Sequence, residues 1–254
     1  MHLRLFVVLP LATDAELSLP SGAARHAQVR RVQPGDTLVL FNGHGHDWPA
    51  TVLAMGKTEV RVRLGVAQPV HRELPQAVTL ALAMPANERM DTLVEKATEL
   101  GVACIQPLQT ERSVLRLQGE RAKRKREHWQ AVAASACEQC GRAVVPHVAP
   151  VLALEAWLQA LPATPAGHRL LLSLQPGARA LPALGLLAEP GRAVLSLSGP
   201  EGGLTADEEA AALSAGFAAV DLGPRVLRAD TAPLAVLAWL ALQQVASQPS
   251  PLHG

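Results

Sequence analysis

The chain of 254 residues has few cysteines, no long apolar run and little net charge, so it lacks the usual marks of a disulfide-rich, membrane-spanning or strongly basic protein. Its three cysteines are too few for a disulfide framework. Cys137 and Cys140 form a lone C-x-x-C without the second pair of ligands that a zinc site needs, which favours two small buried residues one helical turn apart. His44 and His46 follow Asn42-Gly43, a hairpin signal, so we predict a turn there and no metal site.

Long apolar runs and strong net charge are also missing. The apolar segment Pro233–Leu242 falls far short of the roughly 20 residues that a membrane-spanning helix needs. Residues 3–12 lack a signal-peptide cleavage pattern and run into Asp14 and Glu16, which predicts a strand. We therefore expect a cytoplasmic protein without a membrane partner. The net charge of +1 argues against a protein that coats nucleic acid by bulk charge.

Residues 1 to 70 have the pattern of a small β-barrel with closely spaced strands. Apolar character or period-2 alternation predicts strands at Leu3–Leu9, Thr37–Phe41, Trp48–Ala54 and Val60–Leu64. Ala23–Val32 is expected to form a short helix or turn, and it carries Arg25 and Arg30. Two prolines in Gln68–Pro75 predict a linker.

From Ala77 onward strands and helices alternate, which predicts an α/β domain with a mainly parallel sheet, and we place this domain at 77–247. The predicted strands are Val78–Met84, Ala103–Leu108, Val144–Val148, Arg169–Leu174, Ala193–Leu197 and Phe217–Leu222. The predicted helices are Arg89–Leu100, Gln118–Gly141, Leu152–Leu161, one from Thr205 to Gly216, and a last one from about Thr231.

Two strands of this domain end in glycine-bearing loops. Ala193–Leu197 is followed by Gly199–Gly203, and Thr205 and Glu208 then have the spacing of a capping box. The second loop is Leu222–Arg225. Parallel strands bring both loops to one sheet edge, where open α/β sheets bind ligands. The loops lack the Lys-Ser/Thr of a P-loop and the spacing of a dinucleotide-binding turn, so a backbone-lined pocket suits a nucleoside with an amino-acid tail better than a triphosphate.

Basic residues are concentrated between Arg112 and Arg126, where Glu120 is the only acid. A local patch of this kind provides contacts to a phosphate backbone. It is equally typical of a solvated helix start, and the residues alone leave both interpretations open.

Residues 198–209, SGPEGGLTADEE, and 222–232, LGPRVLRADTA, resemble the paired C-terminal motifs of the ribosomal RNA small subunit methyltransferase E family, a family of SPOUT methyltransferases. Further similar segments are 89–91, 95–102, 110–113 and 138–142, so the resemblance covers nearly the whole chain. It implies a PUA-like RNA-binding barrel at 1–70, a trefoil-knotted domain at 77–247 and S-adenosyl-L-methionine as cofactor. The implied reaction is methylation of N3 of one uridine in 16S rRNA, within the assembled or assembling small ribosomal subunit.

The resemblance also implies roles for individual residues. The cofactor-binding candidates are Leu174, Gly199, Glu201, Gly202, Gly203, Leu222, Gly223, Val226 and Leu227. The catalytic candidates are Glu201, Arg228 and Asp230, and Asp230 replaces the longer glutamate that is usual in the family. The RNA-binding candidates are Arg25, Arg30, Arg112, Arg124, Lys125, Arg142 and Arg225.

Several alternatives stay open at this point. Glu201 can act on the substrate or cap a helix, and Arg225 and Arg228 can face the substrate or pair with Glu201 or Asp230. Pro233–Leu242 is apolar around its whole circumference if helical and must be buried on nearly all sides, either within one subunit or, as the family implies, in a homodimer. The alternative functions are methylation of another rRNA or tRNA site and a non-catalytic role in ribosome assembly.

Overall fold

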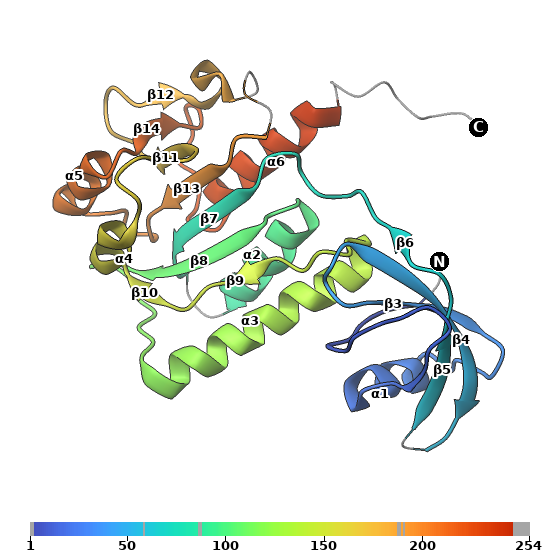
Figure 1. Cartoon of the computed structure of the whole chain (residues 1–254). Coiled ribbons are helices and arrows are strands. Elements are labelled where there is room, and N and C mark those ends of the chain that lie inside the picture. Colours follow the sequence, from blue (N-terminus) through green and yellow to red (C-terminus); the bar gives the residue numbers. More distant parts are fainter. Residues whose placement is uncertain (1–2, 58, 86–87, 187–188, 190, 246–254) are drawn as a thin grey trace. The chain divides into compact units, whose positions relative to one another are not determined.

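The computed structural model describes residues 3–57, 59–85, 88–186, 189 and 191–245. The chain divides into two compact units (Figure 1). The N-terminal unit comprises residues 1–73 with 134–145, and the C-terminal unit comprises 74–133 with 146–254. Residues 246 and 247, the end of the predicted second domain, lie outside the described residues. No helix in the described part of the chain is both long and apolar enough to cross a membrane.

The N-terminal unit is built on a six-stranded sheet in the order β1-β3-β4-β5-β2, with β6 paired to β4. Its strands are β1 (Arg4–Phe6), β2 (Glu16–Ser18), β3 (Thr37–Phe41), β4 (His46–Met55), β5 (Val60–Leu64) and β6 (Gln68–Pro69). The four predicted strands are present, and so is the predicted helix, α1 (Ser21–Val29). The prediction missed β2, and it was wrong to treat Gln68 and Pro69 as linker, because they pair with Asp47 and His46.

Alternation of side chains builds the core of this unit. Val60, Val62 and Leu64 of β5 are fully buried, whereas Arg61 and Arg63 between them are exposed. Successive residues of a strand point to opposite faces of its sheet, so the apolar set of β5 packs inward. Its core partners include Leu5, Leu19, Ala27, Leu38, Leu40, Ala50 and Val52.

Residues 134–145, which contain the end of the long helix α3 (Gly119–Cys140), belong to the same unit. Cys137 packs in a fully buried cluster with Phe41 and Ala143. The backbone N–H of Phe6 donates a hydrogen bond to Glu138 Oε1 at 2.8 Å. The expectation that Cys137 is a buried structural residue is thus confirmed, and Cys140 is half-buried.

The C-terminal unit contains a parallel sheet in the order β10-β8-β7-β13-β11-β14-β12, with β9 paired to β8. Its strands are β7 (Val78–Ala83), β8 (Cys104–Gln109), β9 (His147–Val148), β10 (Leu152–Ala153), β11 (His168–Leu172), β12 (Arg179–Ala180), β13 (Val194–Ser198) and β14 (Ala218–Asp221). Every residue of β7 except Thr79 is buried, which is the pattern of a parallel strand covered on both faces. The predicted parallel α/β fold is confirmed.

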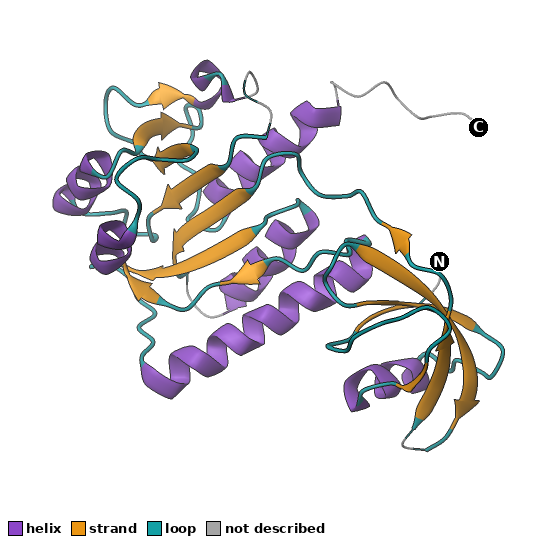
Figure 2. Ribbon diagram, viewed as in Figure 1, coloured by secondary structure: helices purple, strands orange, loops and turns teal. Residues whose placement is uncertain are grey.

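Helices pack around this sheet (Figure 2). They are α2 (Glu88–Glu99), α3, α4 (Leu154–Ala160), the short 3₁₀ helix η1 (Leu181–Leu184), α5 (Ala206–Ser214) and α6 (Thr231–Val245). The predicted capping box at the start of α5 is complete. The N–H of Glu208 donates to Thr205 Oγ1 at 3.2 Å, and the N–H of Thr205 donates to Glu208 Oε2 at 2.9 Å.

Helix α6 is covered within the chain on one face. Val236, Leu237 and Leu240 are fully buried where α6 packs against β13, β7 and α2. Trp239 is half-buried, and Leu242 is 71% exposed. The single chain leaves part of this apolar helix uncovered, so the alternative of full burial within one subunit is wrong, and burial by a second copy stays a prediction.

Candidate functional site

A cavity of about 470 Å³ lies at one edge of the parallel sheet, within the size range of small-molecule sites. The strand β11 lies between β13 and β14, and all three run parallel, so the segments that follow them emerge at this edge. The cavity is lined by residues 172–175, 198–204, 220–222 and 225–229, together with Arg112, Glu209 and Ala232. The structure thus brings the two glycine loops together with the segment that follows β11.

The predicted cofactor residues meet in this cavity with one exception. Gly223 does not line it but lines an adjoining cavity of about 300 Å³, which shares Leu174, Arg225 and Val226 with the first. Leu174 and Val226 are 71% and 78% exposed, although both are large apolar side chains.

Glycine is required in the first loop for two different reasons. A Cβ at Gly199 would lie 2.9 Å from the backbone nitrogen of Leu204, closer than real Cβ atoms approach another atom. Gly203 has a φ of +68°, a conformation that side chains disfavour, and its N–H closes the turn on Pro200 O at 2.9 Å. The loop is therefore a tight turn that a larger residue at either position would open.

Charged groups of both signs line the cavity. The cations are Arg112, Arg225 and Arg228, and the carboxylates are Glu201, Glu209 and Asp221. Sequence reasoning missed Glu209 and Asp221. Ser173 Oγ lies 3.4 Å from Glu209 Oε2, and Asp221 Oδ1 accepts from the N–H of Gly223 at 2.9 Å. The signal for Glu209 was its place in the first turn of α5 directly after the loop.

Glu201 is paired with an arginine that the prediction did not consider for this role. Arg89 Nη1 of α2 lies 3.3 Å from Glu201 Oε1. The capping alternative for Glu201 is wrong, because Thr205 and Glu208 cap α5. Within the described residues Arg225 and Arg228 form no ion pair, so the proposed pairing of these arginines with Glu201 or Asp230 is also wrong.

Two predicted site residues lie outside the cavity lining. Asp230 lines neither cavity; it directly precedes α6, where a carboxylate favours the helix N-terminus, and it accepts from Thr231 Oγ1 at 3.4 Å. Arg142 is only 3% exposed, and its Nε donates to Glu73 Oε1 at 3.0 Å. This guanidinium is buried and paired within the N-terminal unit, and its contact with RNA stays a prediction.

The other RNA-binding candidates lie at the surface of their units. Arg25 and Arg30 are exposed on and just after α1, and Arg124 is exposed on α3, where Lys125 is half-buried. Arg225 is exposed beside the cavity. Arg112 has a different environment, because its guanidinium donates to backbone carbonyls of the first glycine loop.

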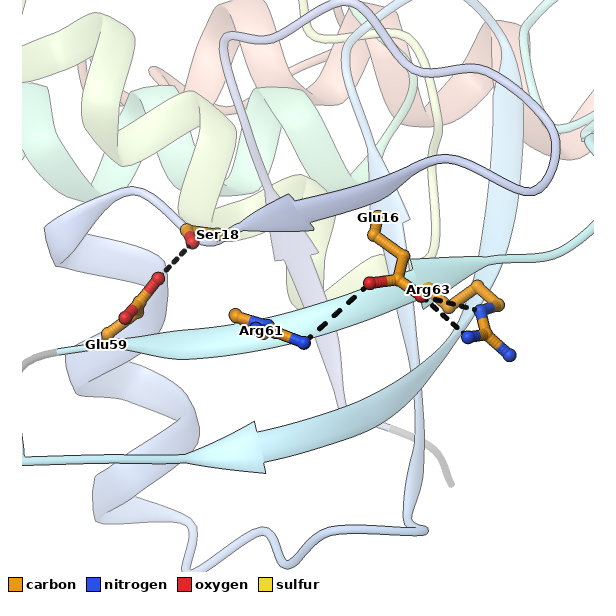
Figure 3. Close-up of polar contacts among 5 residues, drawn as sticks. All are labelled: Glu16, Ser18, Glu59, Arg61 and Arg63. Atoms are coloured by element: carbon orange, nitrogen blue, oxygen red, sulfur yellow. Dashed lines mark hydrogen bonds and ion pairs between the residues drawn. The ribbon is translucent and has the colours of Figure 1, made fainter.

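Figure 3 shows a further group of charges on the N-terminal unit, at the paired strands β2 and β5. Arg63 Nη2 donates to Glu16 Oε1 at 2.6 Å, and Arg61 Nη2 lies 3.7 Å from Glu16 Oε2. The hydrogen bond from Arg63 holds the pKa of Glu16 below its usual value. Two exposed cations thus share one carboxylate. The period-2 alternation of β5 could have identified both arginines as surface residues.

Family comparisons agree with this geometry. The sequence model of a family described as an RNA methyltransferase domain matches residues 72–241, and that of an RNA methyltransferase PUA domain matches residues 19–65. The fold, the cavity and these two matches therefore place the chain in the class of RNA methyltransferases.

The ribosomal RNA small subunit methyltransferase E of Synechocystis is 33% identical over 245 residues, covering 94% of this chain and 77% of the relative. That of Bacillus subtilis is 30% identical over 220 residues, covering 85% of each chain. The chain belongs to the ribosomal RNA small subunit methyltransferase E family.

Solved structures give the same result. The ribosomal RNA small subunit methyltransferase E of Neisseria gonorrhoeae, bound to S-adenosyl methionine, has a TM-score of 0.87 and 36% identity, covering 96% of this chain and 98% of that one. The Legionella pneumophila protein Lpg2936, in complex with the cofactor SAM, has a TM-score of 0.88 and 31% identity with the same coverage. The resemblance predicted from the motifs is confirmed.

Proposed function

We propose that this chain transfers a methyl group from S-adenosyl-L-methionine to N3 of a uridine in the 16S rRNA of the small ribosomal subunit. The observation that carries the proposal is the cavity formed by the two glycine loops and the segment after β11. Two solved relatives that resemble this chain over 96% of its length hold this cofactor. The uridine N3 target follows from the family resemblance of the motifs.

The lining of the cavity fits this cofactor. The exposed side chains of Leu174 and Val226 offer apolar surface for a flat nucleobase. The carboxylates of Glu201, Glu209 and Asp221 complement a ligand with a sulfonium and an ammonium group. When bound, S-adenosylmethionine supplies a methyl group that is activated by positive sulfur.

The chain's own residues supply the proton chemistry. Uridine N3 carries a proton, and it becomes a good nucleophile when a carboxylate such as Glu201 accepts that proton. Arg89 holds the Glu201 carboxylate at the cavity. Arg225 and Arg228 can stabilise the negative charge that develops on uracil O2 or O4. Because N3 lies on the pairing edge, the target base must be unpaired or turned out of its helix.

The two units take separate roles in this proposal. The PUA-like N-terminal unit binds RNA through its exposed arginines, and the C-terminal unit carries the reaction. The basic segment around Arg124 adds contacts to the phosphate backbone. The position of β11 between the consecutive strands β13 and β14 supports the trefoil-knotted arrangement that the family resemblance implies.

The uncovered part of α6 supports a homodimer. Leu242 is exposed and Trp239 is half-buried on a helix without charged residues, and a second copy would cover this surface. We propose that the protein is cytoplasmic and that it acts on 16S rRNA within the assembled or assembling small ribosomal subunit.

Reconstitution tests the function. Purified protein and S-adenosylmethionine are incubated with small subunits from a strain that lacks the gene, and the 16S rRNA nucleosides are analysed by mass spectrometry. We expect one N3-methyluridine, absent when the cofactor is withheld. A methyl group on a ribose oxygen, or on tRNA, would assign another site. RNA binding without methyl transfer would indicate a non-catalytic assembly factor.

A further inference from the structure

The loop that follows β8 is rigid at its base. Thr110 and Ser113 are 3% and 5% exposed, and their hydroxyl oxygens lie 2.9 Å apart. Ser113 Oγ also accepts from the N–H of Thr110 at 2.9 Å, and the N–H of Ser113 donates back to Thr110 O at 3.2 Å. These bonds close a small turn and present Glu111 and Arg112 from a fixed base.

Arg112 reaches from this turn to the first glycine loop. Its Nη1 donates to Gly202 O at 2.9 Å and lies 3.4 Å from Leu204 O. The side chain also lies alongside the loop backbone, because a Cβ at Gly202 would be 3.5 Å from both Cβ and Cδ of Arg112. One guanidinium thus holds two carbonyl groups on either side of Gly203, the residue with positive φ.

Glu208 makes a second connection between the same segments. Its Oε1 accepts from the N–H of Glu111 at 2.8 Å, while its Oε2 accepts from the N–H of Thr205 at 2.9 Å. A carboxylate that only capped α5 would need the bond from Thr205 but not the bond from Glu111. Glu208 therefore ties the start of α5 to the turn after β8.

We propose that Arg112 and Glu208 are positioning residues that hold the glycine loop of the cofactor cavity in its binding conformation. The inference rests on the proposed function, since it assigns the cavity to S-adenosylmethionine. It replaces the prediction that Arg112 contacts RNA. A loop that contains three glycines loses much conformational freedom when it is ordered, and a loop already held in place avoids that cost when the ligand binds.

Calorimetry with S-adenosylmethionine tests the proposal on the full-length chain. Arg112→Ala removes one charged donor, and we expect about fivefold weaker affinity, with Arg112→Lys in between because an ammonium can still reach one carbonyl. Glu208→Gln keeps the size of the side chain but retains a single acceptor oxygen for two N–H groups. We expect it to weaken affinity in the same direction.

Two matched variants serve as controls. Asp207→Asn removes the same negative charge from the same first turn of α5, so it reports the electrostatic contribution to the helix alone. Arg192→Ala removes an exposed arginine that pairs with Glu189, outside the cavity lining. Both are expected to bind the cofactor as the wild type does, and thermal unfolding confirms that each variant is folded.

Hydrogen exchange without cofactor makes the test independent of the proposed function. The amides of residues 202–204 are expected to exchange faster in Arg112→Ala and Glu208→Gln than in the wild type and in Asp207→Asn. If the exchange rates and the cofactor affinity of Arg112→Ala match the wild type while RNA binding weakens, Arg112 is an RNA contact and the inference fails. If the wild type does not bind S-adenosylmethionine, the proposed function fails, and the exchange rates still decide whether these residues hold the loop.

Discussion

Arg89 Nη1 lies 3.3 Å from Glu201 Oε1, and this ion pair joins α2 to the first glycine loop. The two side chains are 44% and 37% exposed, so the pair contributes little to stability. The ion pair instead fixes a position, because Arg89 holds the carboxylate of Glu201, the proposed proton acceptor, at the cavity.

This relationship predicts different effects for two variants. Glu201→Gln removes the proton acceptor and should lower the single-turnover methylation rate by about 100-fold at saturating cofactor. Arg89→Ala keeps the carboxylate but frees it, so a smaller loss is expected. Quench-flow measurement with saturating cofactor provides the rates. A Glu201→Gln enzyme that methylates at the wild-type rate would show that another group takes the proton.

The first glycine loop can be tested by a matched pair of alanines. A Cβ at Gly199 meets the backbone of Leu204 at 2.9 Å, whereas a Cβ at Gly202 meets only the Arg112 side chain at 3.5 Å. Gly199→Ala should therefore weaken S-adenosylmethionine binding at least tenfold, or about 1.4 kcal/mol, and Gly202→Ala much less. Calorimetry on both folded variants checks this order. If Gly199→Ala binds S-adenosylmethionine as tightly as Gly202→Ala does, the conformation of the loop does not determine cofactor binding.

The basic segment on α3 gives a prediction about salt. Reversing the charges of Arg124 and Lys125 to glutamate should weaken RNA binding and flatten its dependence on salt concentration, because fewer counterions are released. Cofactor affinity should stay the same. Arg192→Glu is the control for a charge reversal elsewhere in the C-terminal unit. An unchanged salt slope would mean that the segment is a solvated helix face.

Much of the fold could be predicted because local patterns agree with tertiary packing. The alternation of β5 and the capping box at Thr205 were both read correctly from the sequence. The predicted strand at Val144–Val148 is present as β9, but the two-residue strands β10 and β12 could not be found in this way, since so short a segment carries no periodicity. Their pairing depends on the longer strands beside them.

The site was predicted less completely than the fold. The glycine loops have distinctive residues, so their meeting at one sheet edge followed from strand direction. The partners of charged side chains did not follow, because they come from segments far apart in sequence. Arg142 pairs with Glu73, and Arg112 reaches Gly202. An isolated arginine in a sequence carries no sign of whether it faces solvent or a carbonyl group.

We predict that the free energy of unfolding depends on pH through the partly buried carboxyl group of Glu138. Burial raises its pKa above the ordinary value of 4.5, despite the opposing effects of the Phe6 N–H, His26 and Arg4. The folded chain therefore keeps this proton to higher pH than the unfolded chain, so the contribution of Glu138 to stability is full below about 4.5 and is lost as pH rises through the raised pKa.

Glu138→Gln should abolish that loss. The amide oxygen can still accept from the N–H of Phe6, but it does not titrate. Urea unfolding of both proteins between pH 4 and 8 should show a decline in the wild type that is smaller in the variant. The exposed Glu127→Gln on the same helix serves as control and should follow the wild type. Parallel curves for all three proteins would contradict the prediction.

Helix α6 gives the test of assembly. Leu237 and Leu240 are fully buried within the chain, so a charge at either position would damage the core and report nothing about a partner. Leu242 is 71% exposed on the same apolar helix, and Leu242→Glu should leave the subunit folded while placing a charge in the proposed contact. Light scattering should then show a shift from dimer to monomer, and methylation should fall with it. Leu213→Glu, at a 48% exposed position on α5, is the matched control and should remain dimeric. A wild-type protein that is fully active as a monomer would rule out the dimer, and the apolar surface of α6 would then have to be covered by another partner.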